Sequence, residues 1–124
     1  MMTKRMILFV LLLMAVLPAT SQSSYWMNQA KSYTREAEYY TRQAEGYDRE
    51  ADYYTRQAQS NLREAEYYSR HNNYDRAQQY QRRAREATDK ATSYTRRASE
   101  AREKARSYMR RAEEAMEKAR RSTN

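Results

Sequence analysis

Residues 37–76 read AEYYTRQAEGYDRE, ADYYTRQAQSNLRE and AEYYSRHNNYDR, three copies of one repeat, of which the third is two residues short. Fourteen-residue copies also cover 23–36 before this stretch and 77–90, 91–104 and 105–118 after it. Fourteen residues make two heptads, so the chain keeps one heptad register on each side of the short copy. The repeat and its single interruption together predict the fold.

Alanine and tyrosine fill the positions that a coiled coil buries. With Ala37 at heptad position a, every a residue from 37 to 65 is alanine, and position d is aromatic except at Asn61. From Ala77 to Ala119, position a is again alanine, and d alternates between tyrosine and alanine. Such a seven-residue repeat predicts a left-handed coiled coil. Since Pro18 is the only proline and Gly46 the only glycine, nothing later in the chain forces a helix to break.

The two-residue deletion predicts a turn. In a straight helix it would rotate the alanine stripe by about 200°, since each residue turns the helix by ~100°. Asparagine tolerates the left-handed conformation that ends a helix, and Asn73 can cap the next one, with Asp75 in its first turn. We therefore predict an all-α antiparallel helical hairpin, a two-stranded coiled coil with helices at 22–70 and 74–121, a turn at 71–73 and a tail at 122–124.

The two helices match when core residues whose numbers sum to 145 face each other. Tyr40 then faces Ala105 and Tyr47 faces Ala98; nine such layers set an aromatic against an alanine, and none sets two aromatics together. Large against small fills space well. An intermolecular antiparallel dimer of long straight helices would use the same surfaces. Because alanine buries little area, we expect a hairpin that is only modestly stable alone.

Charges beside the core favour the same antiparallel pairing. Position g of the first helix is always Glu or Gln, and position g of the second is always Arg or Lys. Antiparallel helices bring g beside g, so we expect acidic or neutral groups to meet basic ones along the contact. Each exposed pair contributes only about 0.2–1 kcal/mol, so these charges specify the partner more than they stabilise it.

The N-terminus has the features of a secretory signal peptide over residues 1–21. Lys4 and Arg5 precede the apolar run 7–17, Pro18 breaks that run, and Ala19 and Ser21 fit the −3 and −1 positions of a cleavage site. Eleven apolar residues are too few to span a bilayer, which needs ~20, although an uncleaved anchor is the alternative. After cleavage the chain holds 22 basic and 16 acidic residues. It has no cysteine, so no disulfide stabilises it in an oxidising compartment.

No pattern in the sequence predicts catalysis, a cofactor or a metal site. His71 is the only histidine and lies at the expected turn, and acidic residues occupy outward helix positions rather than a and d. The outward face of the first helix is the candidate site. Its position c carries Tyr25, Tyr39, Tyr53 and Tyr67, and each of the last three is followed three residues later by an arginine, so we expect cation–π stacks there. We predict that these four tyrosines form a face for lateral assembly or oxidative cross-linking.

The alanine-filled heptads over 23–121 resemble those of silk-type coiled coils and other secreted structural proteins of capsules, threads and mineralised hard-tissue matrices. That resemblance implies a secreted, extracellular, non-enzymatic scaffold that self-associates. Acidic polysaccharides and acidic matrix proteins are further candidate partners for a cationic chain. We expect neither nucleic-acid binding nor stable membrane insertion. The alternatives are a soluble cationic protein that binds polyanions or membranes, and a protectant that is disordered until dried.

Overall fold

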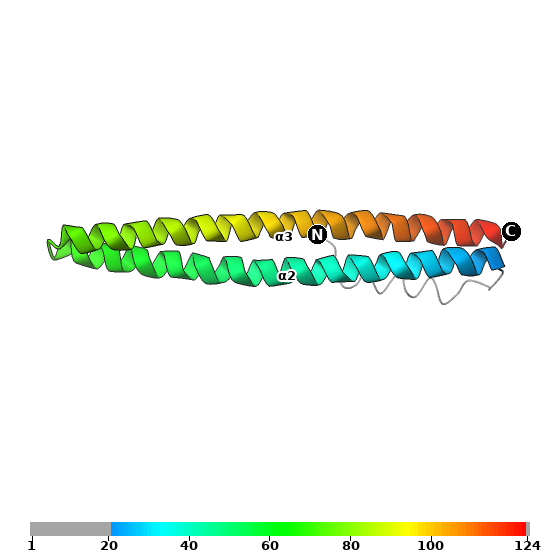
Figure 1. Ribbon diagram of the computed structural model, residues 1–124, viewed down its shortest axis with the longest axis horizontal. Coiled ribbons are helices and arrows are strands. Elements are labelled where there is room, and N and C mark those ends of the chain that lie inside the picture. The colour runs from blue at the N-terminus through cyan, green and yellow to red at the C-terminus, as the bar shows by residue number, and fades with distance from the viewer. Residues whose placement is uncertain (1–20, 124) are drawn as a thin grey trace. The chain divides into compact units, whose positions relative to one another are not determined.

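The computed structural model describes residues 21–123, which form two long helices, α2 (Ser21–Arg70) and α3 (Tyr74–Ser122). The helices run antiparallel and pack against each other as a hairpin (Figure 1). The predicted all-α, two-helix antiparallel hairpin is therefore confirmed. The alternative prediction, a long straight helix that continues through residues 71–73, is wrong. The predicted signal peptide lies outside the described residues except for Ser21, the first residue of α2.

The chain divides into two compact units, and each contains a segment of both helices. One unit comprises the chain up to Ala44 together with Glu100 onward, and it contains the free ends of the helices. The other runs from Glu45 to Ser99 and contains the turn. We call these the end unit and the turn unit.

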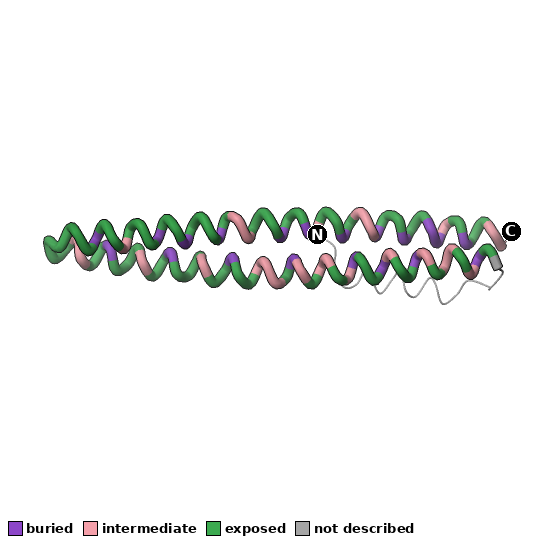
Figure 2. The backbone as a smooth tube through the Cα atoms, in the orientation of Figure 1, coloured by how far each residue is buried: buried purple, intermediate pink, exposed green. Residues whose placement is uncertain are grey.

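Alanine forms the buried row in both units. In each, the buried residues lie on the sides of the helices that face each other (Figure 2). The a-position alanines Ala37, Ala98 and Ala112 have no exposed surface, whereas the tyrosines at d are half-buried. We call these a and d positions the seam. Its alanines let the two backbones approach, and its tyrosines add the faces of their rings.

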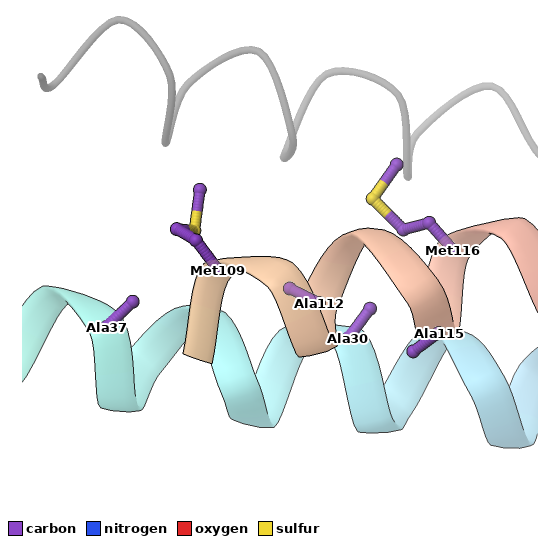
Figure 3. Close-up of a cluster of buried hydrophobic side chains, with 6 residues drawn as sticks. All are labelled: Ala30, Ala37, Met109, Ala112, Ala115 and Met116. Carbon is purple, nitrogen blue, oxygen red and sulfur yellow. The ribbon is translucent and has the colours of Figure 1, made fainter. Parts of the chain in front are cut away.

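The end unit adds larger apolar groups to its alanines. Met109 and Met116 are buried with Ala30, Ala37, Ala112 and Ala115, and partly buried Trp26, Met27, Tyr33 and Tyr108 pack against this cluster. Figure 3 shows the two methionine side chains, seven residues apart on α3, extending to the same side. Methionine fills irregular gaps well, which suits it to a cluster whose other buried members are alanines.

The turn is closed by two hydrogen bonds that cap the end of α2 and one that caps the start of α3. Asn72 adopts the left-handed conformation with φ of 59°. Its N–H donates to the carbonyl of Ser69 at 3.2 Å, and the N–H of Asn73 donates to the carbonyl of Tyr68 at 2.8 Å, which is the Schellman pattern. The Asn73 Oδ1 then accepts from the N–H of Arg76 at 3.4 Å and caps α3. Both roles predicted for the asparagines are confirmed.

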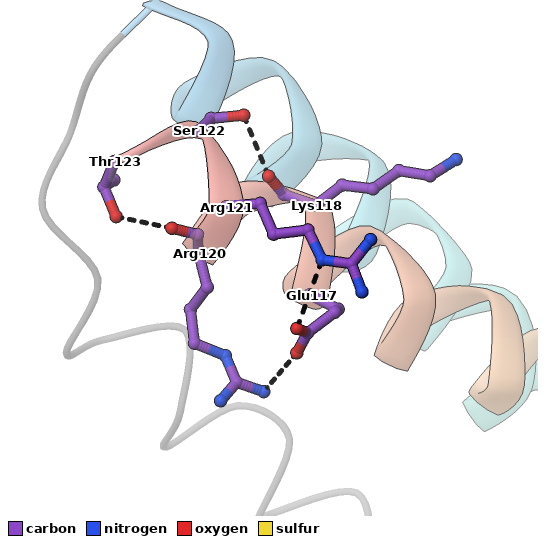
Figure 4. Close-up of polar contacts among 6 residues, drawn as sticks. All are labelled: Glu117, Lys118, Arg120, Arg121, Ser122 and Thr123. Carbon is purple, nitrogen blue, oxygen red and sulfur yellow. Dashed lines mark hydrogen bonds and ion pairs between the residues drawn. The ribbon is translucent and has the colours of Figure 1, made fainter.

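The far end of α3 satisfies its last carbonyls with short side chains. Ser122 Oγ donates to the Lys118 carbonyl at 2.8 Å, and Thr123 Oγ1 donates to the Arg120 carbonyl at 2.7 Å (Figure 4). Glu117 forms ion pairs with Arg120 at 2.9 Å and Arg121 at 3.5 Å. The two arginines place positive charge at the negative end of the helix dipole, where it stabilises the helix.

Neither described helix carries a stretch of apolar residues that would let it cross a lipid bilayer.

Replacing Asn72 with alanine should destabilise the hairpin by about 1–2 kcal/mol, because a Cβ without a local polar partner is costly in the left-handed region. Asn72→Gly is the matched control. Both variants lose the hydrogen bond that Tyr74 donates to Asn72 Oδ1 at 3.1 Å, but glycine adopts positive φ freely. Urea unfolding followed by circular dichroism should separate the two, and equal losses would contradict a conformational role for Asn72.

Enlarging the fully buried Ala98 to leucine should reduce the free energy of unfolding by about 1–3 kcal/mol, because the seam has no room for the added carbons. The neighbouring Ser99→Leu, at an exposed position, adds the same side chain without entering the seam. If Ala98→Leu were as stable as Ser99→Leu, the close approach of the helices would not be a constraint.

Candidate functional site

Tyrosine rings from α2 stack on tyrosine rings from α3 at three places along the seam. The ring planes are within 10° of parallel in each pair, and the centroids are 5.5–5.8 Å apart. In the end unit the pair is Tyr40 with Tyr108; in the turn unit the pairs are Tyr54 with Tyr94 and Tyr68 with Tyr80. The expectation that no two aromatics would meet across the seam is therefore wrong.

The register of the two helices explains why the predicted layers did not include this contact. Each stacked pair has residue numbers that sum to 148, three more than the 145 of the predicted layers. A second, tilted contact joins Tyr33 to Tyr108 and Tyr47 to Tyr94, with sums of 141. Rings at d of one helix thus meet rings at d of the other between the expected aromatic–alanine layers. A tyrosine is long enough to reach past its own layer.

An exposed tyrosine adjoins each stacked pair. The rings of Tyr39 and Tyr40 meet edge to face at 5.2 Å and 77°. Tyr53 meets Tyr54 in the same way at 5.1 Å, and Tyr67 meets Tyr68 at 5.2 Å. Each place on the seam therefore holds three rings: an exposed ring, a seam ring of α2 and a stacked ring of α3. We call these sets the tyrosine triads; they are Tyr39/Tyr40/Tyr108, Tyr53/Tyr54/Tyr94 and Tyr67/Tyr68/Tyr80.

Cations cover the stacked rings of every triad. In the first, Lys104 Nζ lies 5.3 Å from the centroid of Tyr40, and the Arg111 guanidinium lies 5.1 Å from that of Tyr108. The other stacked rings have equivalent partners at 5.0–5.4 Å, which are Lys90 over Tyr54, Arg97 over Tyr94, Arg76 over Tyr68 and Arg83 over Tyr80. Arg76 also donates to the Tyr68 hydroxyl at 3.3 Å.

These cations all lie at position g of α3, and their partners differ from those predicted. Position g of α2 was expected to supply acidic or neutral partners to these basic residues. Arg83, Arg97 and Arg111 instead lie over the ring three residues earlier in their own helix, and no ion pair joins them to the g-position glutamates within residues 21–123. Each guanidinium therefore contacts the negative face of a half-buried ring instead of a carboxylate at position g of α2.

All four tyrosines predicted as the assembly face are on the surface. Tyr25, Tyr39, Tyr53 and Tyr67 are 49–55 % exposed, and the last three are the outer members of the triads. Within residues 21–123 no arginine lies over these last three rings, so the arginine stacks expected on them are wrong. Arg56 forms an ion pair with Asp52 at 2.9 Å and Arg70 with Glu66 at 3.3 Å, so acidic groups one turn earlier take these guanidinium groups. The exposed rings make polar contacts of their own, such as the hydrogen bond from Gln43 to the Tyr39 hydroxyl at 2.8 Å.

A fourth triad would start at Tyr25, and it is incomplete. Tyr25 meets Trp26 edge to face at 4.9 Å, and Lys118 Nζ lies 4.4 Å from the indole. The position whose number completes the sum of 148 is Ser122, which has no ring to stack. The repeat of the sequence therefore specifies three complete triads and a partial fourth.

The chemistry available at the triads is that of phenols next to cations. Residues 21–123 contain no group of three or more His, Cys, Asp or Glu side chains placed to hold a metal ion. The Tyr67 ring lies against the His71 ring, with centroids 4.2 Å apart and planes tilted by 32°. His71 Nδ1 lies 2.8 Å from the Tyr67 carbonyl, so the single histidine takes part in the turn. Phenol rings can pack, donate hydrogen bonds and lose one electron to an oxidant.

The triads could not be found by searching for catalytic motifs. The signal was present in the sequence as the YY pairs at 39–40, 53–54 and 67–68, combined with single tyrosines at 80, 94 and 108. Once the turn is known, the second tyrosine of each YY pair faces the single tyrosine of α3 whose residue number brings the sum to 148.

No protein-family model matches the chain, and no curated protein or solved structure matches it either.

Removing the ammonium groups from the seam rings should destabilise the hairpin. The triple variant Lys90→Met, Lys104→Met and Lys118→Met keeps helix propensity and stem length but deletes three cation–π contacts, each worth about 0.5–1 kcal/mol at such sites. A control with the same change in charge is Arg85→Met, Arg96→Met and Arg106→Met, which alters exposed cations of α3 away from the rings. Urea denaturation should show the larger loss in the lysine variant; equal losses would assign the effect to net charge alone.

Proposed function

We propose that the chain is a secreted structural protein: a two-stranded coiled coil of two-heptad repeats that assembles side by side into an extracellular material. In this proposal residues 1–21 direct export and are removed, and the hairpin is the building unit. The material is of the kind found in silks, capsules or the organic matrix of mineralised tissue. The protein contributes shape and contacts, without catalysis.

The exposed tyrosines on α2 are the observation that carries this proposal. Tyr25, Tyr39, Tyr53 and Tyr67 recur every fourteen residues at one heptad position, and about half of each side chain is exposed. Tyrosine supplies a large, stiff contact surface with a polar end, which is why it is enriched in interfaces. A single exposed ring needs no explanation, but a row in strict register with the repeat favours contact with a partner that has the same repeat. A second copy of the chain meets that condition.

Charge distribution supports association between copies and with polyanions. Residues 22–70 hold seven basic and eight acidic residues, whereas 71–124 hold fifteen basic and eight acidic residues. The α2 side of one hairpin is thus nearly neutral, and the α3 side is strongly cationic. Acidic polysaccharides or acidic matrix proteins would bind the α3 side, which leaves the tyrosine row of α2 available for a second copy.

Replacing all four outward tyrosines with serine should abolish lateral assembly and leave the hairpin folded, because these side chains lie outside the seam. Sedimentation velocity over a range of protein concentrations measures the assembly, and circular dichroism reports the helices. The wild-type chain is expected to associate as its concentration rises, and the four-tyrosine variant is expected to sediment as a monomer.

The control replaces four exposed polar residues of α2, Gln22, Asn28, Gln57 and Gln59, with serine. It introduces the same number of serines into the same helix and should assemble as the wild type does. A wild-type chain that stays monomeric at all concentrations, or a four-tyrosine variant that associates as strongly as the control, would refute the proposed assembly face.

A further inference from the structure

We propose that the three stacked tyrosine pairs are sites of oxidative coupling, at which dityrosine bonds join α2 to α3 within one chain. The pairs are Tyr40–Tyr108, Tyr54–Tyr94 and Tyr68–Tyr80. This goes beyond the proposed function, because it concerns a covalent modification inside one hairpin and needs no contact between chains.

Ring orientation is the first argument. Coupling of two phenoxyl radicals forms a bond between ring carbons ortho to the oxygens, and the orbitals that overlap stand perpendicular to the ring planes. Rings that are parallel within 5–10°, as in the three stacked pairs, present these orbitals to each other. The edge-to-face pairs Tyr39–Tyr40, Tyr53–Tyr54 and Tyr67–Tyr68 have planes 77–83° apart, so their orbitals point past each other.

Confinement in the seam is the second argument. Each stacked ring is half-buried and has a cation over its face, and the ring that lies parallel to it belongs to the other helix. Two groups held side by side react as if at very high concentration, which favours the bond within the chain over bonds between chains. The outward rings have no parallel neighbour of this kind among the described residues.

The exposed ring of each triad gives a route for the electron. Tyr39, Tyr53 and Tyr67 are about half exposed, so an oxidant in solution reaches them before it reaches the seam. Each meets the α2 ring of its stacked pair at 5.1–5.2 Å between centroids. A radical formed on the surface ring can take an electron and a proton from the seam ring, which restores the surface phenol and moves the radical inward.

The reaction balances with hydrogen peroxide as the oxidant and a haem peroxidase as the catalyst. Two phenols each lose one electron and one proton, and the two phenoxyl radicals form one carbon–carbon bond between ortho carbons. The hydrogens on those carbons leave as protons while two protons return to the oxygens, which restores both aromatic rings. Hydrogen peroxide takes the two electrons and two protons and becomes two waters. The linked chain is therefore lighter by two hydrogen atoms for each bond.

Such bonds would stabilise the hairpin covalently, as disulfides stabilise other secreted proteins. The chain has thirteen tyrosines and no cysteine. A bond between Tyr40 and Tyr108 closes a long loop, and cross-links that close long loops restrict the unfolded chain most. A seam of alanine is weak, so a permanent bond across it would add stability that the packing lacks.

The test oxidises the purified chain with a haem peroxidase and hydrogen peroxide at high dilution, where contacts between chains are rare. The monomer is isolated, digested with trypsin and analysed by mass spectrometry. The expected product joins one peptide of α2 to one peptide of α3 with a loss of two hydrogen atoms, and the intact oxidised monomer should unfold at a higher urea concentration. A bond between Tyr39 and Tyr40 would instead stay within one peptide, since no Lys or Arg separates them.

Three variants make the test specific. Tyr40→Phe, Tyr54→Phe and Tyr68→Phe together keep the rings but remove the phenol oxygens, so the links between helices should be lost. The control Tyr33→Phe, Tyr47→Phe and Tyr74→Phe alters the two tilted rings and one exposed ring, and it should keep them. Tyr39→Phe, Tyr53→Phe and Tyr67→Phe should slow the formation of the same links. Circular dichroism confirms that each variant is folded.

The proposal is overturned if the folded wild-type monomer yields no peptide pair joining the helices, if the first variant yields as many as the control, or if dityrosine forms only between chains. The last result would still support assembly through the outward tyrosines, and a monomer that carries the internal links but never associates would refute the assembly face alone. The two proposals therefore fail separately.

Discussion

Contact between alanine rows and tyrosine rings is the interaction on which the hairpin depends. Alanine at position a, from Ala30 to Ala65 and from Ala77 to Ala119, lets the helices approach, but a buried methyl contributes only about 0.8 kcal/mol. The tyrosines at d supply the remaining area, and their rings are large enough to extend beyond one layer. Close helices and long rings together require the rings of opposite helices to overlap, which produces the stacked pairs between Tyr40 and Tyr108 and at the two equivalent places.

Half-buried rings in turn determine what the basic residues do. A ring that lies flat across the seam presents its negative face toward solvent, and position g of α3 projects a lysine or arginine over it. The alternation is regular. From Arg83 to Lys118, each lysine lies over a ring of α2, and each arginine lies over the tyrosine three residues earlier in α3. Arg76, at the first g position, lies over Tyr68 of α2. The excess of positive charge in the second half of the chain thus belongs to the packing of the seam as well as to the surface.

Heptad spacing and the two-residue deletion were sufficient to predict the hairpin, its turn and the buried alanines. The roles of Asn72 and Asn73 also followed from local chemistry, because only a few residues tolerate positive φ or cap a helix. The stacked rings did not follow, because a heptad diagram places side chains by their Cα positions and ignores how far they extend. The predicted charge pairing between g positions was wrong for a similar reason. Heptad positions compare Glu50 of one helix with Arg97 of the other, but they leave out the Tyr94 ring beside the Arg97 guanidinium.

Each YY pair combines an outer tyrosine with a seam tyrosine, and the two rings are in contact. Adjacent residues on a helix point about 100° apart, so a tyrosine at d enters the seam while its neighbour at c stays outside. The same dipeptide therefore places one phenol where it holds the hairpin and one where it meets solvent or a partner, with the two rings in contact. If the outer rings bind a second copy, the contact between hairpins and the contact within each hairpin involve touching side chains. Packing inside the unit and assembly of the units would then be coupled at every fourteenth residue.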